Sequence, residues 1–97
     1  MITMNDDLSN AQIAILCAIY RVHGKKRKGV KHVPVDRIKQ LIPHKYHKDF
    51  KNELKELQNL NLVQRIKSKT YALTKQGFAL AYTYFKEGTC ELVRSEK

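Results

Sequence analysis

A tight polar turn between two short apolar segments limits the folds open to this chain. Residues 61–77, NLVQRIKSKTYALTKQG, contain two strand-like pieces, LVQRI and TYAL, joined by the polar tip KSK. Short strands separated by so few residues form a β-hairpin. The residues before it, 47–60, and those after Thr74 have the spacing of helices. We therefore predict a hairpin that lies directly between two helices.

The first helix is predicted over residues 8–24. Ser9 and Gln12 have the spacing of a capping box, and Gly24 is a typical stop. Apolar residues cover nearly its whole circumference, which is typical of a helix buried on two sides. A single chain of 97 residues can hardly bury one helix on two sides, so we expect a second chain to cover part of this helix.

The other elements follow from local signals. Pro34 and Pro43 bound a short helix, because proline suits a first turn and interrupts an interior. Asn61 follows the third helix, where the backbone turns left-handed and Gly or Asn is favoured. The remaining expected elements are a short strand at 30–33, helices at 35–42, 47–60 and 75–86, and a polar tail at 87–97. The predicted fold class is mainly α with a small β-hairpin, an α+β single domain over residues 1–97 with its core at 8–86.

Charge is the outlying property of the composition. The net charge is +10, and residues 21–55 hold twelve Lys and Arg against Asp36, Asp49 and Glu53. A concentrated positive field attracts polyanions, of which nucleic acid is the commonest. The alternative is a protein that lysine merely keeps soluble.

The two cysteines, Cys17 and Cys90, are far apart and form no CxxC motif. We expect both to be reduced thiols, with no disulfide and no zinc site. The longest apolar run, residues 13–20, is too short to span a membrane and has no signal-peptide features. A cytoplasmic protein, associated with the nucleoid if it binds DNA, is therefore expected.

The order helix, strand, helix, helix, hairpin, helix resembles the winged helix-turn-helix family of DNA-binding proteins, and in particular small prokaryotic and archaeal transcription regulators. The resemblance covers residues 8–86, and its most specific segments are LKELQNLNLV (54–63) and YALTKQG (71–77). Asn61 stands where the family often has glycine, and the hairpin is short. The resemblance implies that the third helix enters the major groove of duplex DNA while the hairpin, or wing, touches the flanking backbone or minor groove.

The third predicted helix has a face suited to DNA. When Phe50 is placed at the centre of its buried side, lysine and asparagine occupy the opposite side and the acids lie on one flank. Lysine binds phosphates or guanine edges, and asparagine pairs with adenine. A solvated face is the alternative interpretation. The candidate DNA-binding residues here are Lys45, His47, Lys48, Lys51, Asn52, Lys55 and Asn59.

The hairpin tip and the segment after the first helix supply further cations. The tip suits phosphate or minor-groove contacts, although turns are often polar for other reasons. The segment KKRK (25–28) resembles a nuclear localisation cluster, but a loop that contacts the DNA backbone is the better hypothesis. The candidates in the wing are Arg65, Lys67, Ser68, Lys69 and Thr70, and those in the basic loop are Lys25, Lys26, Arg27, Lys28 and Lys31.

Catalytic and metal-binding patterns are not predicted. His44 and His47 are three residues apart, but Pro43 and the turn make a shared helical face improbable. The sequence has no nucleophile–base pattern, phosphate-binding loop or catalytic carboxylate pair, so we expect no enzyme, no cofactor, no metal and no small-molecule substrate.

The first and last helices have more apolar surface than one core needs, which a soluble protein normally hides. Many winged helix-turn-helix proteins dimerise through these helices, so the resemblance agrees with a homodimer. The predicted dimer-interface residues are Ile13, Cys17, Tyr20, Phe78, Tyr82 and Phe85. The leading hypothesis is a dimeric regulator that binds duplex DNA, and the alternatives are a winged-helix module that docks on a protein or an RNA-binding protein.

Overall fold

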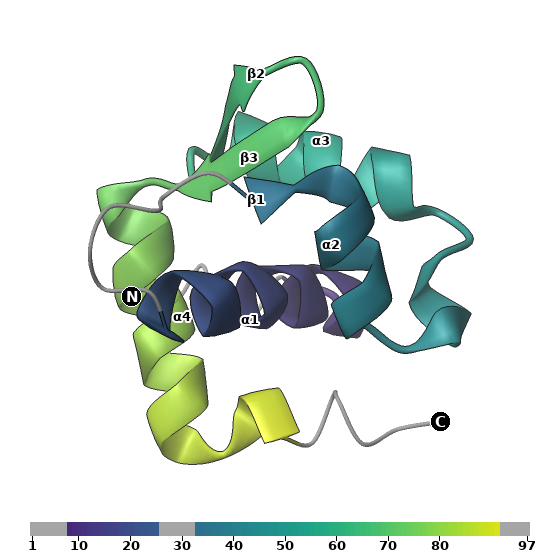
Figure 1. Cartoon of the computed structure of the whole chain (residues 1–97). Coiled ribbons are helices and arrows are strands. Elements are labelled where there is room, and N and C mark those ends of the chain that lie inside the picture. The colour runs from purple at the N-terminus through teal and green to yellow at the C-terminus, as the bar shows by residue number, and fades with distance from the viewer. Residues whose placement is uncertain (1–7, 26–32, 92–97) are drawn as a thin grey trace.

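Helix α1, Asn10–Lys25, is the centre of the molecule in the computed structural model, which describes residues 8–25 and 33–91 (Figure 1). The predicted capping box is confirmed. The Gln12 N–H donates to Ser9 Oγ at 3.2 Å, and the Ser9 N–H donates to Gln12 Oε1 at 3.0 Å. These two bonds satisfy backbone donors at the helix start, which has no earlier turn to accept them.

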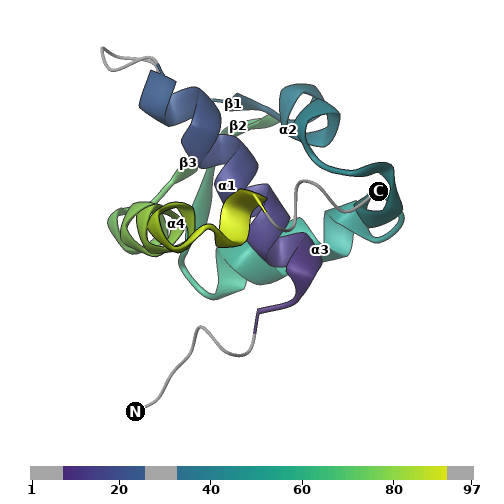
Figure 2. The same cartoon turned by 90° about the horizontal axis from the view of Figure 1, so that it is seen from below.

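The elements of one chain bury α1 on most of its circumference. Helices α2, α3 and α4 and strands β1 and β3 all contact it, and residues 12–19 are buried (Figures 1 and 2). Ile15, Leu16 and Ile19 are fully buried. The expectation that α1 needs a second chain to cover it is therefore wrong, because three helices and a sheet already surround it.

A three-stranded antiparallel sheet holds the predicted hairpin. Its strands are β1 (Val33–Pro34), β2 (Val63–Lys67) and β3 (Thr70–Leu73), in the order β1-β3-β2. The short strand predicted at 30–33 is present at its final residue and extends to Pro34, while 26–32 lie outside the described residues. The fold class is thus mainly helical with a small antiparallel sheet, as predicted.

Helix α2, Val35–Leu41, lies between Pro34 and Pro43 as the sequence indicates. The third helix starts later than predicted. Residues His44–Tyr46 form a 3-10 turn, η2, and α3 covers Phe50–Asn59. Backbone bonds from the Tyr46 N–H to the Pro43 carbonyl and from the His47 N–H to the His44 carbonyl, both 3.0 Å, keep this segment in tighter turns.

The junction after α3 is fixed by backbone geometry. Asn61 has a φ of 63°, the left-handed conformation that the sequence predicted. The Leu62 N–H donates to the Leu57 carbonyl and the Asn61 N–H to the Gln58 carbonyl, each at 3.0 Å, which is the Schellman pattern. Thr74 then caps α4 (Lys75–Glu87), as predicted, by accepting the Gly77 N–H at 3.0 Å.

Gly77 allows α4 to approach the chain after α3 very closely. A Cβ atom built at Gly77 would lie 1.8 Å from the backbone oxygen of Leu62. No side chain fits at this distance, so the first turn of α4 packs directly on backbone.

Part of the predicted polar tail, residues 88–91, returns to α1, while residues 92–97 lie outside the described residues. Helix α4 ends at Gly88, whose φ of 84° reverses the chain. Cys90 is buried and forms a disulfide with Cys17, with Cα atoms 5.6 Å apart. The prediction of two free thiols is therefore wrong, because the fold joins positions that are 73 residues apart in sequence.

Within residues 8–25 and 33–91, no helix has the length and apolar character needed to cross a membrane.

Candidate nucleic-acid interface

Helix α3 divides its residues between the core and the surface. Phe50, Leu54 and Leu57 are buried, at four- and three-residue spacing, and hold the helix on α1. The acidic Glu53 is half-buried on the flank that faces the start of α1, where it accepts from Ser9 Oγ at 3.4 Å. The outward positions, which are exposed, are Lys51, Asn52, Lys55, Glu56 and Asn59.

The wing is attached at its tip. Lys67 pairs with Thr70, so Ser68 and Lys69 form a two-residue turn. The Lys69 carbonyl accepts the Val35 N–H at 2.9 Å, which ties the tip to the first residue of α2. An irregularity between Arg65 and Lys67 adds twist to β2. The wing is thus a fixed ridge beside α3.

An open groove of about 720 Å³ lies between α2, α3 and the wing. Its floor includes the apolar side chains of Phe50, Leu54 and Tyr71. One acid, Asp36, lines it. The basic residues that line it are Lys39, Lys51, Lys55, Arg65 and Lys69. This excess of four positive charges around one concave surface suits a ligand with several negative charges.

The groove brings together half of the two predicted DNA-binding sets. From the set predicted on the third helix it includes Lys51, Asn52 and Lys55, and from the set predicted on the hairpin it includes Arg65, Ser68 and Lys69. The other predicted residues do not line it. They are Asn59, Lys67 and Thr70, and, before the start of α3, Lys45, His47 and Lys48.

The predicted residues that precede α3 lie in the turn between α2 and α3, where His47 contacts other parts of the turn and of α2. His47 Nε2 lies 2.8 Å from the Lys39 carbonyl oxygen, close enough for a ring N–H to donate, and its ring is 4.7 Å from that of His44. Lys45 and Lys48 are exposed nearby. Among the described residues no group of three His, Cys, Asp or Glu is arranged to hold a metal ion.

The groove also has lining residues that were not predicted to bind DNA, namely Val35, Asp36, Lys39, Phe50, Leu54, Gln58 and Tyr71. Gln58 could have been found, because it is seven residues after Lys51 and therefore on the same side of α3. The α2 residues had no such signal. Lys39 Nζ lies 5.5 Å from the Phe50 ring centroid, and this contact between helices exists only in the folded chain.

The predicted basic loop is largely outside the described residues. Lys25 is the last residue of α1, and nothing is described of its side chain or of Lys26, Arg27, Lys28 and Lys31.

The opposite side of the molecule has an aromatic surface. We call Tyr20, Phe78, Tyr82 and Phe85 the aromatic patch. The Tyr20 ring lies 5.3 Å from Phe78, 6.4 Å from Tyr82 and 5.5 Å from Phe85, between centroids. The three α4 rings are 41 to 53% exposed. The other two predicted interface residues, Ile13 and Cys17, are buried within the chain and are not part of this surface.

Comparison of the chain with protein-family models, curated proteins and solved structures finds no match.

Proposed function

We propose that this protein binds duplex DNA, without catalysing a reaction, as a transcription regulator associated with the nucleoid. The observation that carries the proposal is the groove, which is lined by five basic side chains, from α2, α3 and the hairpin, and by one acidic side chain. Cations that converge on a concave surface bind a phosphate backbone and release its counterions.

The proposed arrangement places α3 in the major groove and the wing on the adjacent backbone. The element order α1-β1-α2-α3-β2-β3-α4 supports a winged helix-turn-helix. Ten residues give α3 a length of about 15 Å, enough to reach base edges along one face. Asn52 is the groove residue suited to reading adenine, whereas Lys51 and Lys55 suit phosphates or guanine.

The wing suits a positioning role. Its tip is tied to α2, so Arg65 and Lys69 meet the DNA at a fixed distance from α3. Contacts of this kind set orientation and carry little sequence information. Specificity would then come from the exposed side of α3.

The charges of Lys51 and Lys55 provide the test. Lys51→Glu combined with Lys55→Glu should lower affinity for duplex DNA at least tenfold, about 1.4 kcal/mol, because two attractive charges become repulsive. The matched control is Arg37→Glu combined with Lys75→Glu, two exposed positions outside the groove and outside the aromatic patch that give the same change in net charge. Fluorescence anisotropy at several salt concentrations measures both.

Three outcomes are informative. A large loss confined to the Lys51 and Lys55 variant supports the proposal. Equal losses in both variants would mean that net charge, not the groove, attracts DNA. Tighter binding to RNA of the same length, with the same dependence on Lys51 and Lys55, would assign the groove to RNA instead.

We further propose that two copies pair through the aromatic patch. Leaving large apolar rings in water is unfavourable, by about 1.5–3 kcal/mol for each side chain that could be fully buried. Two-fold pairing would cover the patch and present two α3 helices to half-sites about one helical turn apart.

Tyr82→Glu tests the pairing, because Tyr82 is 47% exposed and a carboxylate there cannot be buried cheaply. Sedimentation at micromolar concentration should give a dimer for the wild type and a monomer for the variant. Thr83→Glu adds the same charge on an exposed neighbouring position and should leave the dimer intact. A wild-type monomer would exclude pairing and leave single-site binding.

A further inference from the structure

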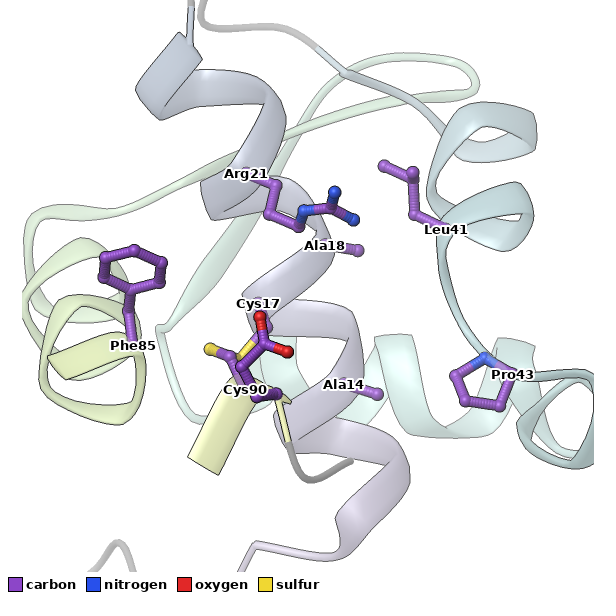
Figure 3. Close-up of a pocket in the computed structure, with 9 residues that line it drawn as sticks. Ala14, Cys17, Ala18, Arg21, Leu41, Pro43, Phe85 and Cys90 are labelled. Carbon is purple, nitrogen blue, oxygen red and sulfur yellow. A yellow bond between two sulfur atoms is a disulfide. The ribbon is translucent and has the colours of Figure 1, made fainter. Parts of the chain in front are cut away.

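The C-terminal strap, residues 88–91, crosses back onto α1 and is fastened there covalently. The Gly88 N–H donates to the Phe85 carbonyl at 3.2 Å, and residues 89–91 form a helical turn. Figure 3 shows the Cys90 side chain directed at Cys17 on α1, and the two sulfurs are bonded. The strap therefore joins the last described residues to the middle of the central helix.

Burial of side chains contributes little to holding the strap. Within the described residues after Tyr84, Cys90 is the one buried side chain. A small cavity of about 40 Å³ remains beside it, between α1, the end of α4 and the segment after α2 (Figure 3). Its α1 wall is formed by Ala14, Cys17, Ala18 and Arg21. Burial of one small side chain next to a cavity contributes little apolar stabilisation, so the covalent bond is the main attachment of the strap to α1 that we identify.

Release of the strap from α1 requires a hinge between α4 and the strap, and Gly88 lies at that position. Gly88 has a φ of 84°, and a Cβ built there would meet no atom within 4 Å. Glycine has no Cβ and adopts positive and negative φ values about equally readily, so its backbone can change conformation at low cost. The residues on its helical side, including Tyr84, remain packed in α4.

We propose that the Cys17–Cys90 disulfide is a redox-sensitive clamp, and that its reduction releases the strap about Gly88 while the rest of the fold persists. The reductant is a dithiol. It gives two electrons and two protons to the S–S bond, which becomes two cysteine thiols, and is itself oxidised to a disulfide. This inference does not depend on the proposed DNA binding.

Two charged residues, Arg21 and Glu91, are among those that line the cavity beside the disulfide. Release of the strap would expose the cavity walls to solvent, namely Ala14, Ala18, Leu41 and Pro43.

Nuclear magnetic resonance relaxation of the ¹⁵N-labelled full chain tests the clamp. In the oxidised protein the strap amides should have order parameters of about 0.85, and in dithiothreitol they should fall below about 0.6. Amides in α3 and the hairpin should remain at about 0.85 in both states. Cys90→Ser, measured without reductant, should give the same low order parameters in the strap as the reduced wild type. This variant separates loss of the disulfide from other effects of dithiothreitol.

Each other result would overturn the proposal. Two reactive thiols in the unreduced, denatured chain would show that the bond does not form. A strap that stays ordered in dithiothreitol or in Cys90→Ser would show that packing, not the disulfide, holds it. Loss of order throughout the reduced chain would show a bond needed for the whole fold rather than a local clamp.

Discussion

The α3–wing side and the α1–α4 side of this molecule differ in the side chains that they present at the surface. On the first side, the groove concentrates five basic side chains that repel one another. On the second side, aromatic rings pack around Tyr20, and a disulfide joins α1 to the residues after α4. The basic residues of the groove and the contacts that stabilise the fold through α1 and α4 are therefore in different parts of the molecule. Substitutions on one side should change binding, and those on the other should change stability.

The largest expected effect is on the free energy of unfolding, through the disulfide on the α1–α4 side. Replacing both Cys17 and Cys90 by alanine removes a cross-link between residues 73 apart, and loop-closure entropy puts its contribution at about 4 kcal/mol. Denaturant unfolding of the variant and the oxidised wild type should show a loss of this size. Affinity for duplex DNA, measured where both are folded, should not change. A loss below about 1 kcal/mol would mean that the cross-link constrains the unfolded chain little.

The next effect lies where the two sides meet, at Gly77. Gly77→Ala should lower the free energy of unfolding by about 3 kcal/mol, because the methyl group would overlap the Leu62 backbone and α4 would have to move. Gly88→Ala is the matched control, since space is open there and only the left-handed backbone is penalised, by about 1–2 kcal/mol. Equal losses would show that α4 shifts easily and that the two sides are not rigidly joined.

On the α3–wing side the expected effect is on binding alone. Lys67→Ala and Lys69→Ala should each lower the slope of log affinity against log salt by about one, if each contacts a phosphate. Both side chains are exposed, so stability should change by no more than about 0.5 kcal/mol. Lys69 lines the groove and Lys67 does not, so a change for Lys69 alone would confine the DNA to the α3 side of the wing.

The smallest effect is expected at Asn61. Glycine adopts its φ of 63° readily, so Asn61→Gly should change stability by only a few tenths of a kcal/mol. The loss of the bond from Asn61 Nδ2 to Gln76 Oε1, 2.9 Å and exposed, is included in that change. Asn61→Ala should cost about 1 kcal/mol or more, because a Cβ atom disfavours this conformation. Thermal unfolding compares the two, and equal stability would mean that the turn relaxes.

Most of the fold could be predicted because its signals are local. The capping box at Ser9 and Gln12, the turn at Asn61 and the cap at Thr74 each depend on backbone groups within four residues. The hairpin and the boundaries of α2 follow from short apolar runs and prolines. The start of α3 was predicted at residue 47 but lies at Phe50, because residues 47–49 form a turn in which the Phe50 N–H donates to the His47 carbonyl at 3.2 Å.

Features that depend on distant residues could not be predicted in this way. No local pattern relates Cys17 to Cys90, so the disulfide was missed. The same limit applies to Ile13 and Cys17 on α1, which were predicted to lie at a dimer interface. Both are buried by segments that follow α1 in the sequence. In the groove, the α3 and wing cations were found from their own segments, but Asp36 and Lys39 join them only through packing of α2.

The disulfide also changes the topology of the polypeptide. Bonding of Cys17 to Cys90 closes most of the chain into a covalent ring, from which only two ends emerge. A single cut by a protease at any peptide bond within that ring opens it without separating two fragments. The nicked oxidised protein therefore keeps the mass of the intact chain plus one water, and it divides into two pieces only after reduction.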